Sequence, residues 1–478
     1  MSELLIPTIG LEIHVQLKTA RKLFSYSSTE FGQKPNTQAS YIDLGMPGKL
    51  PVLNRDAVNL AIRLGLAFGS DIKQNMRFSR KNYFYPDLPK GYQITQDAYP
   101  IIEKGGMEIE LEDGKKYIPL VRAHLEEDAG KSIHDGHPGK TGLDFNRAGV
   151  PLLEIVTEPA LDSAPEAISF LKKLHALVVY LDVSTGNMQE GAFRCDANVS
   201  VRKTKDCPLG TRVEIKNLNS FKAIEKAINH EIKRQSKLIN NGEEIVQETR
   251  LFNVDQLVTK SMRGKEDAAD YRYFPDPDLP GVTIEQVTIQ NIADSMPELP
   301  WIRTRRLIDE YDLNEYDANT IMQERTLADL FESCCKAYKV KPKTVANWIL
   351  GDILMLANKY NSEIKISAEN LGYLINLVSD NTISGTAAKT VLEEHWQSQA
   401  SIDQIINDKN LKQDNDASAI VSLIDEILTE FPGQVSDYLS GKDKLYAFFV
   451  GQAMKKSKGK ANPNILNQHL KEKLDALK

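Results

Sequence analysis

The chain has 478 residues, of which 41% are hydrophobic and 26% charged, and its formal net charge is −7. These values are typical of a soluble globular protein, and the length predicts roughly three domains of about 100 to 200 residues each. No stretch approaches the ~18 apolar residues of a membrane-spanning helix, the N-terminus lacks a secretion signal, and the four cysteines show no C-x-x-C spacing. We therefore expect a cytoplasmic protein with reduced thiols, and we exclude secreted, membrane-spanning and uniformly basic proteins.

The first expected strand covers residues 9–17, where apolar and polar residues alternate. As a strand, this segment places Leu11 and Ile13 on one face and Glu12 and His14 on the other. An acid and a histidine about 7 Å apart on one face suit two ligands of one metal ion, or a histidine held by its carboxylate partner. The alternative is a strand whose polar face meets solvent.

A loop rich in Ser, Gly, Pro and Asn comes next and leads to Asn54, the expected N-cap of a helix. Residues 77–93 then interleave Arg80, Lys81 and Lys90 with tyrosine and phenylalanine side chains. This composition suits an anionic or nucleotide ligand. The alternative is an ordinary aromatic core beside a proline turn.

Residues 122–135 hold two histidines, a lysine and the three consecutive acids Glu126, Glu127 and Asp128. Adjacent carboxylates repel one another, so a folded site that gathers them usually holds a divalent cation or a substrate cation. The alternative is an exposed acidic turn.

A lone acid, Glu154, interrupts an apolar strand that begins at about Pro151. Burying an unpaired carboxylate costs several kcal/mol, so Glu154 needs a cation or a proton. Ser163 and Glu166 then form a capping box, which predicts a helix that ends near Leu181.

Two more alternating strands are expected at residues 193–201 and 211–218, followed by a helix from about Ser220 to Asn241. Polar faces on several strands favour a sheet whose polar side lines a cavity, the alternative being a sheet that faces solvent. The polar faces of these two strands carry Arg194, Asp196, Asn198, Ser200, Arg212, Glu214 and Lys216.

Beyond the prolines of residues 295–300, apolar residues recur at three- and four-residue spacing, which predicts an all-α region. Residues 441–478 hold nine lysines against three acids, a net of +6 that leaves −13 on the rest of the chain. A basic helical tail on an acidic chain indicates an anionic partner, and we expect nucleic acid. The alternative is a solvated lysine-rich helix end.

Eight long motifs stand out along the chain: I-G-L-E-I-H-V-Q-L, R-K-N-Y-F-Y-P-D-L-P-K-G-Y-Q, H-L-E-E-D-A-G-K, D-F-N-R-A-G-V-P-L-L-E-I-V, F-R-C-D-A-N-V-S-V, E-I-K-N-L-N-S-F, D-Y-R-Y-F-P-D-P-D-L and G-K-A-N-P. Together they resemble the B-subunit family of the tRNA-dependent amidotransferases. The resemblance implies an α+β fold. It places a mixed-sheet catalytic cradle domain at residues 1–295, a helical domain at 296–405 and a small α-helical, tRNA-binding tail domain at 406–478.

The resemblance also implies a heterotrimer. In this family an amidase A subunit releases ammonia from glutamine, and a small C subunit holds the other two together. The B subunit uses ATP to activate the carboxylate of misacylated Glu-tRNA(Gln) or Asp-tRNA(Asn) and aminates it, as a carbon–nitrogen ligase with glutamine as amido donor. This sequence has no G-G-S-S-rich amidase stretch, which agrees with ammonia coming from another subunit. Two alternatives are a non-catalytic tRNA-binding subunit and a stand-alone metal-dependent carboxylate–ammonia ligase.

Site residues follow from the resemblance position by position. Mg²⁺ is the expected metal, and Mn²⁺ also suits a site that contains a histidine. The resemblance places Lys81 and Lys90 along the path of ammonia, with Glu127 between them and the metal, and leaves Glu126 and Asp128 supporting or solvated roles. The expected metal ligands are Glu12, His14, Glu127 and Glu154; the expected contacts to nucleotide or tRNA acceptor end are Arg194, Asp196, Asn198 and Lys216; and the expected tRNA-binding tail residues are Lys455, Lys456, Lys458 and Lys460.

One departure from the family concerns a zinc knuckle. Many members carry C-x-C after the first strand and C-x-x-C before a glycine-proline turn, and the matching residues here are Ser25, Ser27, Ser40 and Asp43. All four thiolates are missing. We therefore predict no structural zinc, with the loop held by hydrogen bonds and packing instead.

Overall fold

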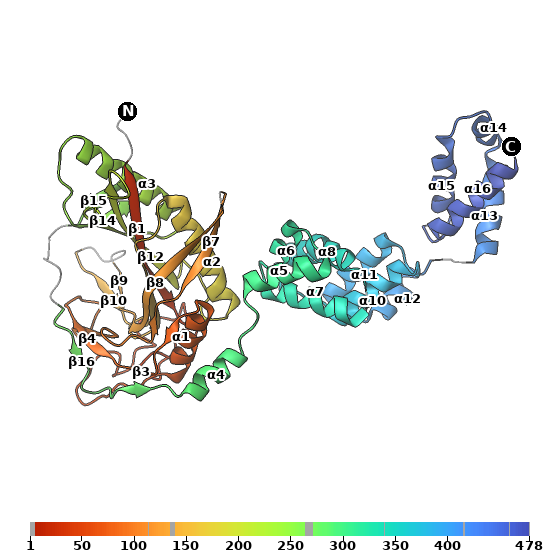
Figure 1. Cartoon of the computed structure of the whole chain (residues 1–478). Coiled ribbons are helices and arrows are strands. Elements are labelled where there is room, and N and C mark those ends of the chain that lie inside the picture. Colours follow the sequence, from red (N-terminus) through yellow and green to blue (C-terminus); the bar gives the residue numbers. More distant parts are fainter. Residues whose placement is uncertain are drawn as a thin grey trace. The chain divides into compact units, whose positions relative to one another are not determined.

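The computed structural model describes residues 5–112, 114–133, 139–262, 271–338, 340–413, 416–457 and 459–477. The chain divides into two compact units, Met1–Leu299 and Pro300–Lys478. A mixed sheet with a few helices forms the first unit and helices form the second, which confirms the predicted α+β fold (Figure 1). The domain limits near residues 295 and 405 stay a prediction. Among the described residues, no helix combines the length and the apolar character needed to cross a bilayer.

The first strand, β1 (Ile6–Gln16), lies inside the large sheet, between the antiparallel strands β11 (Pro151–Thr157) and β12 (Phe193–Arg202). Its apolar residues Ile9, Leu11, Ile13 and Val15 are at most 1% exposed, as the alternation predicts. The sheet runs in the order β15-β14-β13-β12-β1-β11-β8-β5-β4-β16. Its other strands are β2 (Asp71–Ile72), β4 (Ser79–Asn82), β5 (Tyr92–Thr95), β6 (Ile102–Glu103), β7 (Gly106–Leu111), β8 (Gly114–Glu127), β13 (Val213–Lys216), β14 (Thr249–Asn253), β15 (Val258–Ser261) and β16 (Phe274–Pro275).

Among the residues that the structure describes, two short antiparallel pairs lie outside this sheet. The first consists of β9 (Lys131–Ile133) and β10 (Gly142–Asp144). The second consists of β3 (Asn75–Met76) and β17 (Val282–Thr283).

The predicted helices of the first unit begin at the expected residues. Asn54, Ser163 and Ser220 accept backbone N–H groups at the starts of α1 (Arg55–Ala67), α2 (Ala164–Tyr180) and α3 (Phe221–Asn240). Helix α3 packs on β12 and α2 packs on β7, so the apolar side of the sheet is covered by helices. The last helix of this unit, α4 (Gln286–Asp294), packs on α1. The candidate functional site lies on the other, polar side of the central strands.

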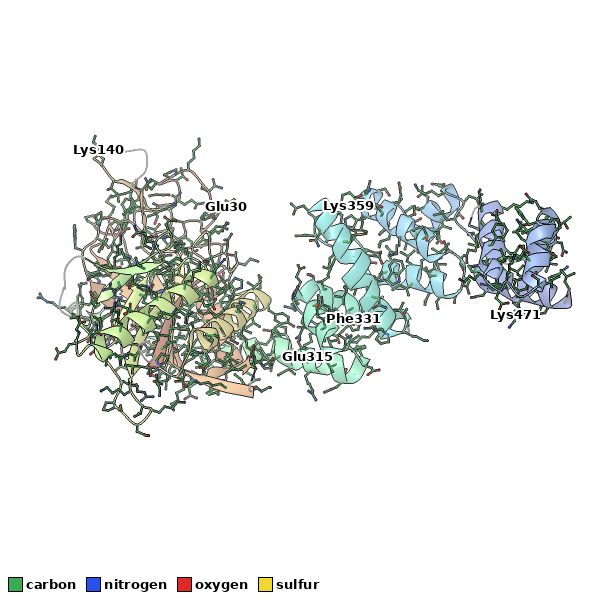
Figure 2. All side chains as sticks on the ribbon, turned by 90° about the horizontal axis from the view of Figure 1, so that it is seen from above. Glu30, Lys140, Glu315, Phe331, Lys359 and Lys471 are labelled. Carbon is green, nitrogen blue, oxygen red and sulfur yellow. The ribbon has the colours of Figure 1, made fainter. Side chains whose placement is uncertain are left out.

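Helical segments make up the second unit. They are α5 (Pro300–Tyr311), α6 (Glu315–Ile321), α7 (Arg325–Tyr338), α8 (Pro342–Trp348), the π-helical turn η1 (Ile349–Ile353), α9 (Leu354–Tyr360), α10 (Ala368–Ser379), α11 (Gly385–Ser398), α12 (Ile402–Asp408), α13 (Ala417–Glu430), α14 (Pro432–Leu439), α15 (Leu445–Lys456) and α16 (Pro463–Ala476). Phe331 is fully buried, whereas Lys359 and Lys471 lie on helix surfaces (Figure 2). Helices α13 to α16 share an apolar core that contains Ile424, Phe449 and Leu470.

Candidate functional site

A row of polar side chains crosses four neighbouring strands. In the antiparallel pairing, His14 lies opposite Arg194 of β12 and opposite Glu154 of β11, and Glu154 lies opposite His124 of β8. Residues directly opposite one another in an antiparallel pair share one face of the sheet. Four segments far apart in sequence therefore present these side chains on the same surface.

Glu126, two residues beyond His124 on β8, joins this row. His14 Nε2 lies 3.4 Å from Glu154 Oε2 and 3.8 Å from Glu126 Oε1. One ligand atom from each of the three residues lies within 4.8 Å of the others. An imidazole nitrogen with two carboxylate oxygens is a donor set that suits Mn²⁺ and, through its oxygens, Mg²⁺. The residues present thus fit the divalent cation that the resemblance implies.

The electrostatics of this cluster favour positive charge. Burial by itself would lower the pKa of His14, but the hydrogen bond and charge of Glu154 and the charge of Glu126 outweigh it and raise that pKa. Burial would raise the pKa of Glu154, but the positive charge of His124 and the contact with His14 hold it below its usual range. The cluster therefore attracts a proton or a metal ion.

Lys81 of β4 adds a cation on the same side. Its amine lies 4.9 Å from the centre of the Tyr271 ring and 5.9 Å from that of Tyr83. Burial would lower the pKa of Lys81, but the negative charges around it, that of Glu126 foremost and that of Glu154 among them, raise it. The lysine therefore stays protonated beside the two carboxylates.

The segment that carries Tyr271 is fastened to β4. Asn82 Nδ2 donates to the carbonyl of Tyr271 at 3.0 Å, and Arg80 forms ion pairs of 2.8 Å with both Asp276 and Asp278. The Arg80 guanidinium also stacks over Tyr92, 4.2 Å from the ring centre. These contacts hold the aromatic ring over Lys81.

Glu127 does not join the cluster. Because successive side chains of a strand alternate, its carboxylate points away from that of Glu126. It accepts from Lys90 Nζ at 2.5 Å through both oxygens, and from the backbone N–H of Ile94 at 3.1 Å. The Lys90 and Glu127 side chains are 7% and 4% exposed. The structure thus pairs Glu127 with Lys90 and places Lys81 with Glu126 and Glu154. Of the two adjacent acids, Glu126 is therefore the one positioned to bind a cation together with His14 and Glu154.

All three consecutive acids are buried, at 3%, 3% and 4% exposure for Glu126, Glu127 and Asp128. The alternative of an exposed acidic turn is therefore wrong, as is a solvated role for Glu126 and Asp128. Asp128 accepts from Arg194 Nη2 and from Gln16 Nε2, each at 2.8 Å. Burial would raise the pKa of Asp128, but the charges of Arg194 and Arg147, together with the hydrogen bonds from Gln16 and Arg194, outweigh it and lower that pKa. Asp128 orients Arg194 beside the cluster.

Glu12 lies next to the cluster, on the side of β12 and β13. Asn198 Nδ2 donates to Glu12 Oε1 at 3.1 Å, while Lys216 forms ion pairs of 2.8 Å with both Asp196 and Glu214. Burial, reinforced by the charges of neighbouring acids, raises the pKa of Glu12. The expected nucleotide-contacting residues thus form one polar surface that continues from the cluster.

Sequence reasoning missed His124 and set Glu126 aside. His124 Nε2 lies 3.5 Å from Glu154 Oε2 and 3.7 Å from Glu126 Oε2. The signal was strand alternation: applied to residues 114–127, it places His124 and Glu126 on one face and Glu127 on the other.

The loop that follows β1 is tied by hydrogen bonds around Asp43. Its carboxylate accepts from Ser25 Oγ at 2.8 Å, from the backbone N–H of Ser40 at 2.7 Å and from Lys22 Nζ at 3.3 Å. Ser27 contributes its backbone N–H, which donates to Ser25 Oγ. Lys22 is 0% exposed. The side chains of Ser25, Asp43 and Lys22 thus connect the loop internally.

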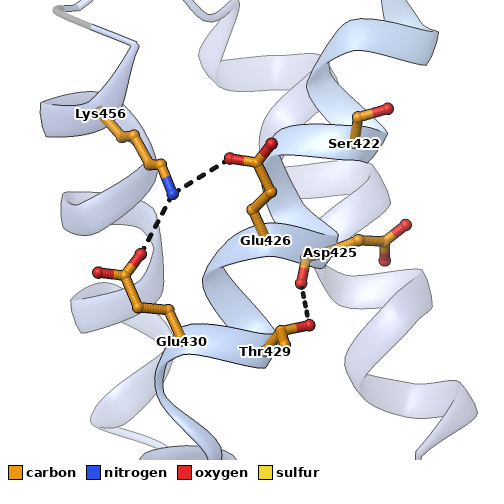
Figure 3. Close-up of a pocket in the computed structure, with 6 residues that line it drawn as sticks. All are labelled: Ser422, Asp425, Glu426, Thr429, Glu430 and Lys456. Atoms are coloured by element: carbon orange, nitrogen blue, oxygen red, sulfur yellow. Dashed lines mark hydrogen bonds and ion pairs between the residues drawn. The ribbon is translucent and has the colours of Figure 1, made fainter.

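The tail lysines lie in different surroundings. Lys456 forms ion pairs of 3.1 Å with Glu426 and Glu430 across a shallow pocket between α13 and α15 (Figure 3). Lys455 is exposed in the last turn of α15, and Lys460 is half-buried before α16. Lys458 lies outside the described residues. Two carboxylates therefore offset the charge of Lys456.

Fold and site together define an α+β domain that carries a candidate cation site on the polar face of its sheet and is followed in the chain by helices. Residues 7–290 match the family model described as the GatB/GatE catalytic domain, and residues 329–474 match the GatB domain. The chain belongs to the GatB family.

Close relatives share nearly their whole length with this chain. A protein of Thioalkalivibrio sulfidiphilus is 52% identical over 98% of each chain. Proteins of Alkalilimnicola ehrlichii and Coxiella burnetii are 54% and 52% identical, over 98% of this chain and 99% of theirs. All three are named as the B subunit of an aspartyl/glutamyl-tRNA(Asn/Gln) amidotransferase.

Proposed function

We propose that this chain is the amidating subunit of a tRNA-dependent amidotransferase, which converts Glu-tRNA(Gln), Asp-tRNA(Asn) or both to the amide form. The observation that carries the proposal is the cluster of His14, Glu126 and Glu154 beside Lys81. It lies inside the part of the chain that matches the catalytic-domain model. The names of the relatives supply the substrate class.

The reaction has two chemical steps. The carboxylate of the misattached amino acid attacks the γ-phosphorus of ATP, which releases ADP and forms an acyl phosphate. Ammonia then attacks the carbonyl carbon and loses a proton. Inorganic phosphate leaves, and the amide is formed. Negative charge develops at phosphate oxygens in both steps, so catalysis needs fixed positive charge there.

His14, Glu126 and Glu154 would hold a divalent cation, Mg²⁺ or Mn²⁺, which neutralises phosphate charge when it is bound. Lys81 and Arg194 face the same cluster and supply positive charge from the protein itself. Both side chains are half-buried, which strengthens this effect, because charges interact more strongly away from water.

The expected roles of the remaining candidates follow from their places. Lys90 and Glu127 line the path by which ammonia arrives, and Glu127 can take up a proton from the incoming nitrogen. The second polar group, in which Glu12 is bound to Asn198 and Lys216 to Asp196, contacts the nucleotide or the acceptor end of tRNA.

The partners are an amidase A subunit, a small C subunit and tRNA. A separate subunit that releases ammonia from glutamine is required, because this sequence has no amidase stretch of its own. The tail lysines contact the tRNA backbone.

The test uses the reconstituted heterotrimer with Glu-tRNA(Gln), ATP and either glutamine or ammonium chloride. Glu126→Gln should abolish amidation with both nitrogen sources, because it removes charge from the cation site. Glu127→Ala should abolish glutamine-driven amidation and leave a residual ammonia-driven reaction. Glutaminase activity and tRNA binding should be retained in both variants, and Glu158→Gln, at an exposed position just beyond β11, is the matched control.

Unchanged amidation in Glu126→Gln would contradict the catalytic assignment and favour a subunit that only delivers tRNA. Turnover of free glutamate without tRNA would instead favour the stand-alone carboxylate–ammonia ligase.

A further inference from the structure

His124 is a buried histidine beside the cation cluster, and the proposed function has given it no role. The residue is 3% exposed. Its Nε2 faces Glu154 Oε2 at 3.5 Å and Glu126 Oε2 at 3.7 Å, which are ion-pair distances. Its other ring nitrogen, Nδ1, is buried and has no hydrogen-bond partner in the described part of the chain.

The buried Nδ1 decides where the ring can carry its proton. A neutral imidazole has one N–H, on either nitrogen, and the imidazolium has both. A proton on Nδ1 alone would be buried without an acceptor, which is unfavourable. A proton on Nε2 instead points at two carboxylates. In the favoured tautomer of the neutral ring, and also in the imidazolium cation, Nε2 carries a proton and has no lone pair for a metal ion.

His14 differs in this respect. Its side chain keeps 20% of its surface exposed, so a proton on Nδ1 can be hydrated. Its Nε2 then offers a lone pair at the point where Glu126 and Glu154 converge. A metal-binding histidine usually has its second ring nitrogen satisfied in such a way.

We propose that the two histidines of this site have different roles. His14 is the single nitrogen ligand of the cation. His124 is a positioning residue that directs Nε2–H at Oε2 of Glu126 and Oε2 of Glu154, and it keeps the other oxygen of Glu126, Oε1, turned toward His14. This inference rests on the cation site of the proposed function.

Electron spin-echo envelope modulation of Mn²⁺ bound to the full chain tests the proposal, because it counts the ¹⁴N nuclei coordinated to the metal. We expect one directly coordinated histidine nitrogen in the wild type. The signal should be lost in His14→Gln and kept in His124→Gln, whose amide nitrogen can take the place of Nε2 and donate in the same direction. Affinity for Mn²⁺ should stay within about threefold in His124→Gln and fall roughly 10- to 100-fold in His124→Asn, whose amide nitrogen lies nearer the Nδ1 position.

The possible outcomes distinguish failure of the inference about His124 from failure of the cation site itself. Two coordinated nitrogens in the wild type, or loss of a nitrogen signal in His124→Gln, would make His124 a ligand and overturn the inference while leaving the cation site intact. Absence of stoichiometric Mn²⁺ binding in the wild type would overturn the cation site itself. Because the nitrogen count of the wild type is decisive, the test holds even if one variant fails to fold.

Discussion

Glu126 and Glu127 are neighbours in sequence and lie in two different environments. Glu126 faces two histidines, whereas Glu127 binds Lys90 and a backbone N–H of β5. A difference of one residue along a strand reverses the face on which a side chain lies. Motif similarity alone does not separate two adjacent acids, because both belong to the same motif.

The buried pair Lys90–Glu127 makes a prediction about stability. Lys90→Met should lower the free energy of unfolding by about 3–5 kcal/mol, because it leaves the Glu127 carboxylate buried without its counter-charge. Adding Glu127→Leu should restore much of that loss. Urea unfolding of the full chain, followed by circular dichroism, measures both effects.

The control is an exposed pair of the same kind. Lys115 and Glu108 have side chains that are 62% and 49% exposed, so Lys115→Met should change stability little. Equal losses in Lys90→Met and Lys115→Met would show that burial of the Lys90–Glu127 pair has no special effect.

At the scale of elements, helix α3 is fastened to the sheet by Glu231. This acid is 0% exposed and accepts from Gln235 Nε2 at 2.9 Å and from Thr259 Oγ1 of β15 at 3.1 Å, besides its ion pair with Arg234. Burial would raise the pKa of Glu231, but the hydrogen bonds from Arg234, Gln235 and Thr259 and the charge of Arg234 together outweigh it and lower that pKa. The ionised form is therefore the one that stabilises the fold.

This depressed pKa predicts a pH dependence of stability. An unfolded glutamate titrates near pH 4.3, so the contribution of Glu231 is fully present at pH 7 and is lost as the pH falls below about 4.3 toward the lower folded pKa. Glu231→Gln should cost about 1–3 kcal/mol at pH 7 and progressively less in acid. Urea unfolding at several pH values measures the difference, with Glu225→Gln at an exposed site of the same helix as control. A difference that does not depend on pH would contradict the prediction.

At the scale of the whole molecule, charge is distributed unevenly along the chain. The last 38 residues carry +6 and the remainder −13, which favours contact of the tail with an anionic partner. The structure adds that Lys456 is already paired with two glutamates (Figure 3). Net charge therefore overstates the number of tail lysines that can reach a phosphate.

The tail makes a prediction about tRNA binding. Lys455→Ala with Lys460→Ala should weaken binding and reduce the slope of log K against log salt by about 0.7–0.9 for each phosphate that is no longer neutralised. Lys456→Ala should change the slope less, because its charge is offset by Glu426 and Glu430. Filter binding at salt concentrations from about 50 to 300 mM measures the slope for each variant. An equal effect of Lys456→Ala would mean that tRNA displaces the two glutamates.

Local patterns were sufficient for several features of this protein. Alternation predicted β1 with Glu12 and His14 on its polar face, capping residues predicted the starts of α1 and α2, and three- and four-residue spacing predicted the helical second unit. Each of these features depends on residues within one or two turns of one another, so the sequence contains the whole signal.

The composition of the site depended on contacts between distant segments. His14, Glu126 and Glu154 come from three strands, and their meeting depends on the register in which β1, β11 and β8 pair. Register is set when the entire apolar face of the sheet is buried, because a slip of one residue would expose that face to water. For this reason the sequence predicted a site at the acidic stretch, and only the tertiary structure placed Glu126 with His14 and Glu154 and paired Glu127 with Lys90.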